Sequence, residues 1–137
     1  MNVKAGNALA RAALSLALIL PAAHAESDPL QLVGYSGYLG EWELTATVTE
    51  GGSTTPKEYS GPLSMKHVGL CTQDGPEEKS GKIRVQMVPS ESRIKATLWV
   101  DGVECGYQGI LSDFYSGTMD CSGHERVPLK LWIKESK

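Results

Sequence analysis

Imidazole, thiol and thioether side chains are the groups in this 137-residue chain best suited to chemistry; it contains 3 His, 3 Cys and 4 Met. Met65, His67 and Cys71 lie close together in the sequence, and sulfur combined with imidazole is a ligand set that copper prefers. Their spacing predicts a metal site formed by these three residues. The competing interpretation is structural, because methionine commonly fills gaps in cores and the cysteines of exported proteins commonly pair.

Catalytic motifs are absent from the sequence. A nucleophile needs a general base beside it, yet the chain contains neither a Gly-x-Ser-x-Gly turn nor a His-Glu-x-x-His motif. His67 falls on the inward side of an expected strand, and His124 lies in the polar run Ser122–Arg126, which is typical of a solvated turn. We therefore expect a protein that is not an enzyme and has no cofactor.

The first 25 residues have the pattern of an export signal. Lys4 and Arg11 flank the start of an apolar run over Ala12–Leu20, and Ala23-His24-Ala25 is a small-residue cleavage site. The run is too short to span a bilayer, which takes roughly 20 apolar residues. We expect cleavage after Ala25, a single domain over residues 26–137, no membrane span, and a periplasmic or secreted location.

The domain that follows the signal is acidic. It carries 16 Asp and Glu but only 11 of the 13 Lys and Arg, because Lys4 and Arg11 belong to the signal, so its net charge is −5 with neutral histidine. Nucleic-acid binding needs many cations to displace phosphate counterions, which argues against that class of partner. The 112 residues of this domain suffice for one hydrophobic core.

Alternating apolar and polar residues run through the domain and predict β-strands. In Glu41–Glu50, for example, Trp42, Leu44, Ala46 and Val48 share one face, and glutamates and threonines share the other. Further strands are expected from about Leu63, over Lys82–Val88, over Arg93–Val100, on either side of Asp113, and over Val127–Ile133, with Leu30–Tyr38 as an irregular addition and Thr72–Gly81 as a polar loop.

Turn sequences set how the expected strands pair. Asp101-Gly102 is a preferred pair for a two-residue type I′ hairpin, which places apolar residues of its two strands on one face. The loop Pro89–Ser92 has an even length, so it also joins two strands face to face and sets Lys82 opposite Trp99.

The three cysteines predict a disulfide and leave one thiol over. A hairpin that turns at Asp113 sets Cys105 directly opposite Cys121, within disulfide reach if the two residues form a non-hydrogen-bonded pair. We favour a Cys105–Cys121 bond, and the alternative is a bond from Cys71 to either of them.

Short strands at regular spacing, with no amphipathic helix, indicate an antiparallel meander. Such a sheet has exposed edges unless it closes on itself. We therefore predict an all-β fold, a small antiparallel up-and-down barrel of seven or eight strands, with a β-sandwich as the alternative. Small inward residues such as Gly109 and Gly117 leave space beside Tyr107 for a ligand cavity, unless Trp42 and Tyr107 fill it.

Gly40-Glu41-Trp42, at the head of the first alternating strand, resembles the start of calycin-type small barrels when taken together with the meander. These barrels include lipocalins, avidins and small periplasmic metalloprotease inhibitors. The resemblance covers three residues and the layout of the strands. It implies a structural role for Trp42, as a plug at one end of the barrel, and a binding or inhibitory function.

A candidate binding surface surrounds Trp99, which falls on an otherwise polar outer face. Exposed aromatic residues are enriched where proteins bind partners. The basic residues predicted near it are Lys82, Arg84, Arg93 and Lys95. Such a basic island on an acidic domain suits an acidic partner. Alternatively, Lys82 merely covers Trp99 through a cation–π contact.

Taken together, these features predict an exported, non-catalytic β-barrel binding module with an inhibitor-like or protein-interaction role. A lipocalin-like carrier of a small apolar ligand is the first alternative, and a periplasmic metal-handling protein is the second. A carrier requires an internal cavity of about 300 Å³ or more, whereas an inhibitor requires a packed interior and a protruding segment.

Overall fold

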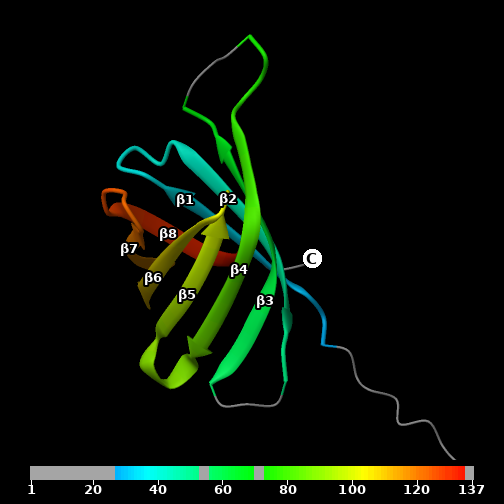
Figure 1. Cartoon of the computed structure of the whole chain (residues 1–137). Helices are drawn as coiled ribbons and strands as arrows, with labels where there is room; N and C mark the ends of the chain where they lie inside the picture. The colour runs from blue at the N-terminus through cyan, green and yellow to red at the C-terminus, as the bar shows by residue number, and fades with distance from the viewer. Residues whose placement is uncertain (1–26, 53–55, 70–72, 135–137) are drawn as a thin grey trace, which may run out of the picture.

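The computed structural model describes residues 27–52, 56–69 and 73–134. They form a closed barrel in which each strand pairs antiparallel with the next and the last strand pairs with the first (Figure 1). The strands are β1 (Leu30–Ser36), β2 (Trp42–Glu50), β3 (Lys57–His67), β4 (Glu78–Val88), β5 (Arg93–Val100), β6 (Val103–Leu111), β7 (Tyr115–Cys121) and β8 (Val127–Lys134), with a short 3-10 helix at Pro89–Glu91. The barrel prediction is confirmed over the sandwich alternative.

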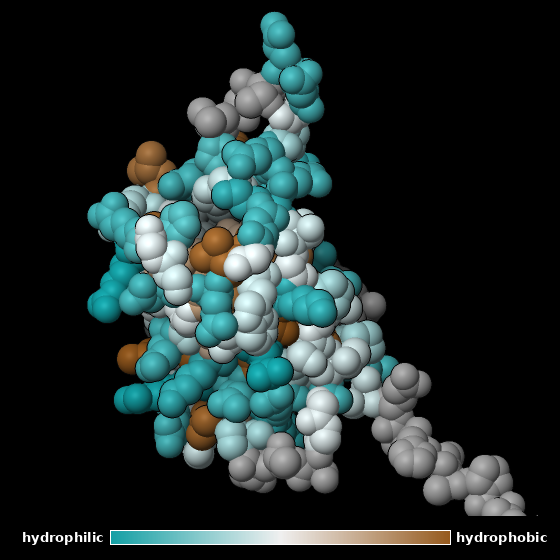
Figure 2. All heavy atoms as spheres, viewed as in Figure 1, coloured by the Kyte–Doolittle hydropathy of each residue, from teal (hydrophilic) through white to brown (hydrophobic). Residues whose placement is uncertain are grey.

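The core lies inside the barrel and follows the alternation in the sequence, since side chains along a strand point to opposite faces. Figure 2 shows one outer face, where hydrophilic residues predominate and hydrophobic ones appear as separate spots. All eight strands contribute to the buried apolar cluster, which comprises Leu32, Leu44, Ala46, Val48, Leu63, Met65, Ile83, Val85, Met87, Ile94, Ala96, Leu98, Val100, Cys105, Tyr107, Met119, Leu129 and Leu131.

The predicted strand register is confirmed. Lys82 lies opposite Trp99, and Cys105 lies opposite Cys121. The turn at Asp101-Gly102, which joins β5 to β6, has φ values of 48° and 78°. This is the left-handed backbone that a type I′ turn requires at both positions.

Three strands differ from the sequence-based expectation. Leu30–Ser36 is a regular strand, and its pairing with β8 closes the barrel. β3 begins at Lys57 rather than near Leu63, and β4 begins at Glu78, inside the expected polar loop. The added parts of β3 and β4 are rich in polar and small residues. They are held in the sheet by backbone pairing and lack the apolar alternation by which a strand is predicted from sequence.

Tyr107 fills the interior beside the inward glycines. Its hydroxyl donates a hydrogen bond to the carbonyl of Tyr115 at 3.1 Å, and its side chain is buried. A methyl group at Gly109 would collide with that hydroxyl, and one at Gly117 would collide with the carbonyl oxygen of Gln108. Tyr107 therefore fills the space beside Gly109, and at Gly117 the neighbouring strand packs closely. Neither glycine leaves a ligand cavity.

Cys105 and Cys121 form a disulfide between β6 and β7, as predicted. The amide of Ser122 donates to the carbonyl of Glu104 at 3.3 Å, so the neighbouring cysteine pair is a non-hydrogen-bonded one, in which side chains approach most closely. A disulfide is typical of proteins in an oxidising environment. The predicted signal over residues 1–25 lies outside the described residues. In the ranges that the structure covers, no helix has the length and hydropathy needed to cross a membrane.

Removing the disulfide is expected to destabilise the barrel. The bond links residues 16 positions apart. Closing a loop of about that length reduces the entropy of the unfolded chain, which stabilises the folded protein by about 3 kcal/mol. The double variant Cys105→Ala/Cys121→Ala should therefore lose about 2 to 4 kcal/mol of unfolding free energy in urea titrations. Cys71→Ala, which leaves the bond intact, is the control; an equal loss in that variant would contradict the pairing.

Tyr107 is expected to make the barrel sensitive to alkali. Burial, and secondarily the proximity of Tyr115, raises the pKa of the Tyr107 phenol above its ordinary value. The unfolded chain releases this proton at about pH 10 while the folded chain retains it, so the unfolding free energy falls as the pH rises through that value. Tyr107→Phe should cost about 1 kcal/mol at neutral pH through the lost hydrogen bond. The difference in unfolding free energy between Tyr107→Phe and the unmodified protein should shrink at higher pH, as measured by denaturant titrations at a series of pH values. A constant difference would contradict the raised pKa of Tyr107.

Candidate functional site

One end of the barrel opens into a cavity that we call the cup. Because successive strands run in opposite directions, the β1–β2, β3–β4, β5–β6 and β7–β8 connections all lie at this end. The cup has a volume of about 380 Å³, and apolar atoms make up most of its lining. Its apolar residues are Met65, Val100, Val103, Met119 and Val127, together with the Cys105–Cys121 disulfide.

Charged and polar side chains surround the opening of the cup. They are Glu41, Lys79, Asp101, His124 and Glu125. Two of the connections at this end are tied together, because the amide of Val68 donates to the carbonyl of Glu41 at 2.7 Å. The cup thus combines an apolar interior with a rim rich in carboxylates.

Trp42 lies in the wall of the cup. Its ring packs against the ring of His67, with centroids 4.6 Å apart, and the Lys79 ammonium lies 4.5 Å from the indole centroid. The Trp42 side chain is only half-buried, and the cup remains open beside it. A structural role for Trp42 stays a prediction, and in this geometry the residue also lines the cup.

The predicted metal ligands are placed only in part. Met65 is buried in the barrel, and His67 lies two residues further along the same face of β3, against Trp42. Cys71 lies outside the described residues. Among the residues that are described, no three His, Cys, Asp or Glu side chains gather where they would hold a metal ion. The site of Met65, His67 and Cys71 stays a prediction.

The contact at Trp99 differs from the one expected. Its indole Nε1 donates to the Glu104 carboxylate at 3.1 Å, and the Arg84 guanidinium lies 5.6 Å from the ring centroid. Arg84, not Lys82, thus covers Trp99. Lys82 is directly opposite Trp99 in the register, whereas Arg84 is a diagonal neighbour, and diagonal pairs lie within the reach of long side chains.

A second hollow, which we call the outer groove, crosses the outside of the barrel over β4 to β7. It measures about 780 Å³ and is lined by three of the predicted basic residues, Arg84, Arg93 and Lys95, but not by Lys82 or Trp99. A binding role for these residues stays a prediction. Small residues in the groove are Gly106, Ser116 and Thr118, which leave the sheet accessible.

Charges in the outer groove are partly paired. Arg84 contacts Glu58 at 3.4 Å, and Arg126 contacts Asp120 at 2.9 Å. Within the described ranges, Arg93 and Lys95 take part in no ion pair. The groove also contains Ile110, whose side chain is 61% exposed. It therefore presents two available cations beside an apolar side chain.

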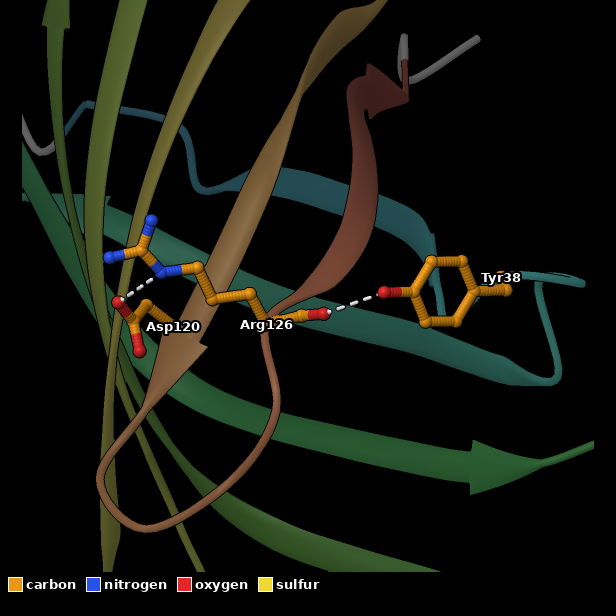
Figure 3. Close-up of polar contacts among 3 residues, drawn as sticks. All are labelled: Tyr38, Asp120 and Arg126. Atoms are coloured by element: carbon orange, nitrogen blue, oxygen red, sulfur yellow. Dashed lines mark hydrogen bonds and ion pairs between the residues drawn. The ribbon is translucent and has the colours of Figure 1, made fainter.

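Arg126 lines the outer groove and makes two polar contacts. Its guanidinium reaches Asp120 on β7, and its backbone carbonyl accepts a hydrogen bond from the Tyr38 hydroxyl at 3.1 Å (Figure 3). The second bond joins the β1–β2 connection to the β7–β8 connection at the cup end. Arg126 was not identified from the sequence, because a single arginine in a polar turn has no distinguishing pattern.

No protein-family model, curated protein or solved structure matches this chain. The cup and the outer groove are therefore the features on which a function can be based.

Proposed function

We propose that the protein is an exported, non-catalytic binding module that holds a small apolar ligand in its cup. The observation that supports this most directly is the apolar cavity of about 380 Å³ at the mouth of the barrel. Ligand sites occur preferentially in barrel mouths, have volumes of about 300 to 1,000 Å³, and are lined mainly by apolar side chains with a few polar groups. The cup has each of these properties.

The cup makes the carrier hypothesis stronger than the inhibitor hypothesis favoured by the sequence. The opposite half of the interior is packed around Tyr107, so a ligand would enter only the half near Trp42. Export is supported by the signal pattern before residue 26 and by the disulfide. A calycin-type relationship is supported by Gly40-Glu41-Trp42, which leads into β2 of a closed up-and-down barrel.

A homologous series of linear alcohols tests the cup. Each methylene group moved from water into it contributes about 0.8 kcal/mol, so the Kd should fall about fourfold per carbon until the cup is full. Titration calorimetry measures this series. Val103→Phe, which places a ring in the cup, should weaken binding at least tenfold, whereas Val88→Phe on the outer face is the matched control. Equal affinities for the two variants would place the ligand elsewhere.

The outer groove supports a second candidate function, the binding of an acidic protein segment. Arg93 and Lys95 offer unshared positive charge within the described part of the chain, and Ile110 adds an apolar contact. An extended peptide that presents both acidic and apolar side chains on one face would match both features, because side chains two positions apart share a face and can meet Ile110 and the cations together.

A peptide of repeated Glu-Ser-Val-Ser units, which presents glutamate and valine on the same face of an extended chain, tests the outer groove. The double variant Arg93→Glu/Lys95→Glu should weaken its binding at least tenfold, because two attractions become repulsions. The effect should diminish as salt increases, as measured by fluorescence anisotropy. Lys82→Glu, on the same outer face but outside the groove, is the control. An equal loss in that variant would indicate a diffuse basic surface, and no binding to the unmodified protein would exclude this function.

A further inference from the structure

The charges around the cup indicate what kind of ligand it accepts. The rim carries three carboxylates, those of Glu41, Asp101 and Glu125, against one ammonium, that of Lys79. We infer that the ligand of the cup is an amphipathic cation, with an apolar body inside the barrel and a positively charged head at the rim. This inference rests on the proposed function and specifies its ligand class.

The one ammonium at the rim is already engaged. Lys79 Nζ lies 4.5 Å from the centroid of the Trp42 ring and 3.8 Å from Oε1 of Glu77. An anionic head group would have to draw Lys79 away from both partners. Lys79 therefore gives the cup little capacity to select an anion.

The rim carboxylates have more capacity for a new partner. Glu41 Oε2 accepts the amide of Leu39 at 3.0 Å, and among the described residues no basic side chain forms an ion pair with Glu41. In the part of the chain that the structure describes, Asp101 and Glu125 form no ion pair with any basic residue. Both are exposed, so a cation that binds between them loses little hydration.

The Trp42 ring at the cup already has a cation against it, the Lys79 ammonium. A ligand head group would have to replace Lys79 to contact this ring, so the recognition of the head rests on the carboxylates and not on Trp42. Among the described residues, the rim thus sets an excess of carboxylates at the mouth of an apolar cavity.

Three probes with one ten-carbon chain separate the head group from the apolar body. Decyltrimethylammonium and decanoate are titrated by calorimetry below their micelle concentrations, and 1-decanol is titrated below its solubility limit. We expect decyltrimethylammonium to bind about fivefold or more tightly than 1-decanol, and decanoate to bind most weakly, with the difference shrinking as salt increases. If decanoate binds as tightly as the cation, the inference fails while the cup remains a ligand site. If none of the three binds, the proposed function itself fails.

Charge-neutralising variants show which groups recognise the head. In Asp101→Asn/Glu125→Gln, the ratio of the 1-decanol Kd to the decyltrimethylammonium Kd should fall about fivefold, since each exposed attraction is modest. Asparagine also tolerates the positive φ of residue 101, so this variant should fold. The matched control Glu91→Gln/Asp113→Asn removes two exposed carboxylates at the opposite end of the barrel. An unchanged ratio in the rim variant, or an equal fall in the control, would overturn the inference.

Discussion

The pairing of β1 with β8 is the interaction on which the architecture depends. Their ladder runs from Gln31 opposite Lys134 to Ser36 opposite Leu129 and joins the two edges of the meander. Once the sheet is closed, every strand has two neighbours, and each side chain of a strand points either into the barrel or out of it. Tyr107 and the apolar side chains around it pack one half of the interior, while the other half opens as the cup.

Much of this fold was predictable because it is recorded in short-range patterns. The Asp101-Gly102 turn sets the register of β5 and β6, and the hairpin that turns at Asp113 sets the register of β6 and β7, which places Cys105 opposite Cys121. The extensions of β3 and β4 were missed, because their pairing depends on backbone hydrogen bonds between segments such as Lys57–Pro62 and Lys82–Met87. Apolar periodicity carries little information about such pairing.

The candidate sites were harder to predict than the fold. The sequence placed Arg84, Arg93 and Lys95 on one outer face, and these three residues line the outer groove. Their role in binding stays a prediction, as does that of Trp99, whose contacts with Glu104 and Arg84 no sequence pattern indicates. The cup was missed at its true position because its wall combines residues from strands distant in sequence. Whether inward side chains such as Val103 fill a cavity depends on the curvature of the barrel, which composition does not give.

The disulfide has a role beyond joining two strands, because both of its cysteines line the cup. Oxidation of the pair thus fixes this part of the wall, and it proceeds where the surroundings remove electrons from thiols. The shape of this wall of the cup is in this way tied to the redox conditions around the chain, because in reducing surroundings the two cysteines would carry separate thiols in place of the bond.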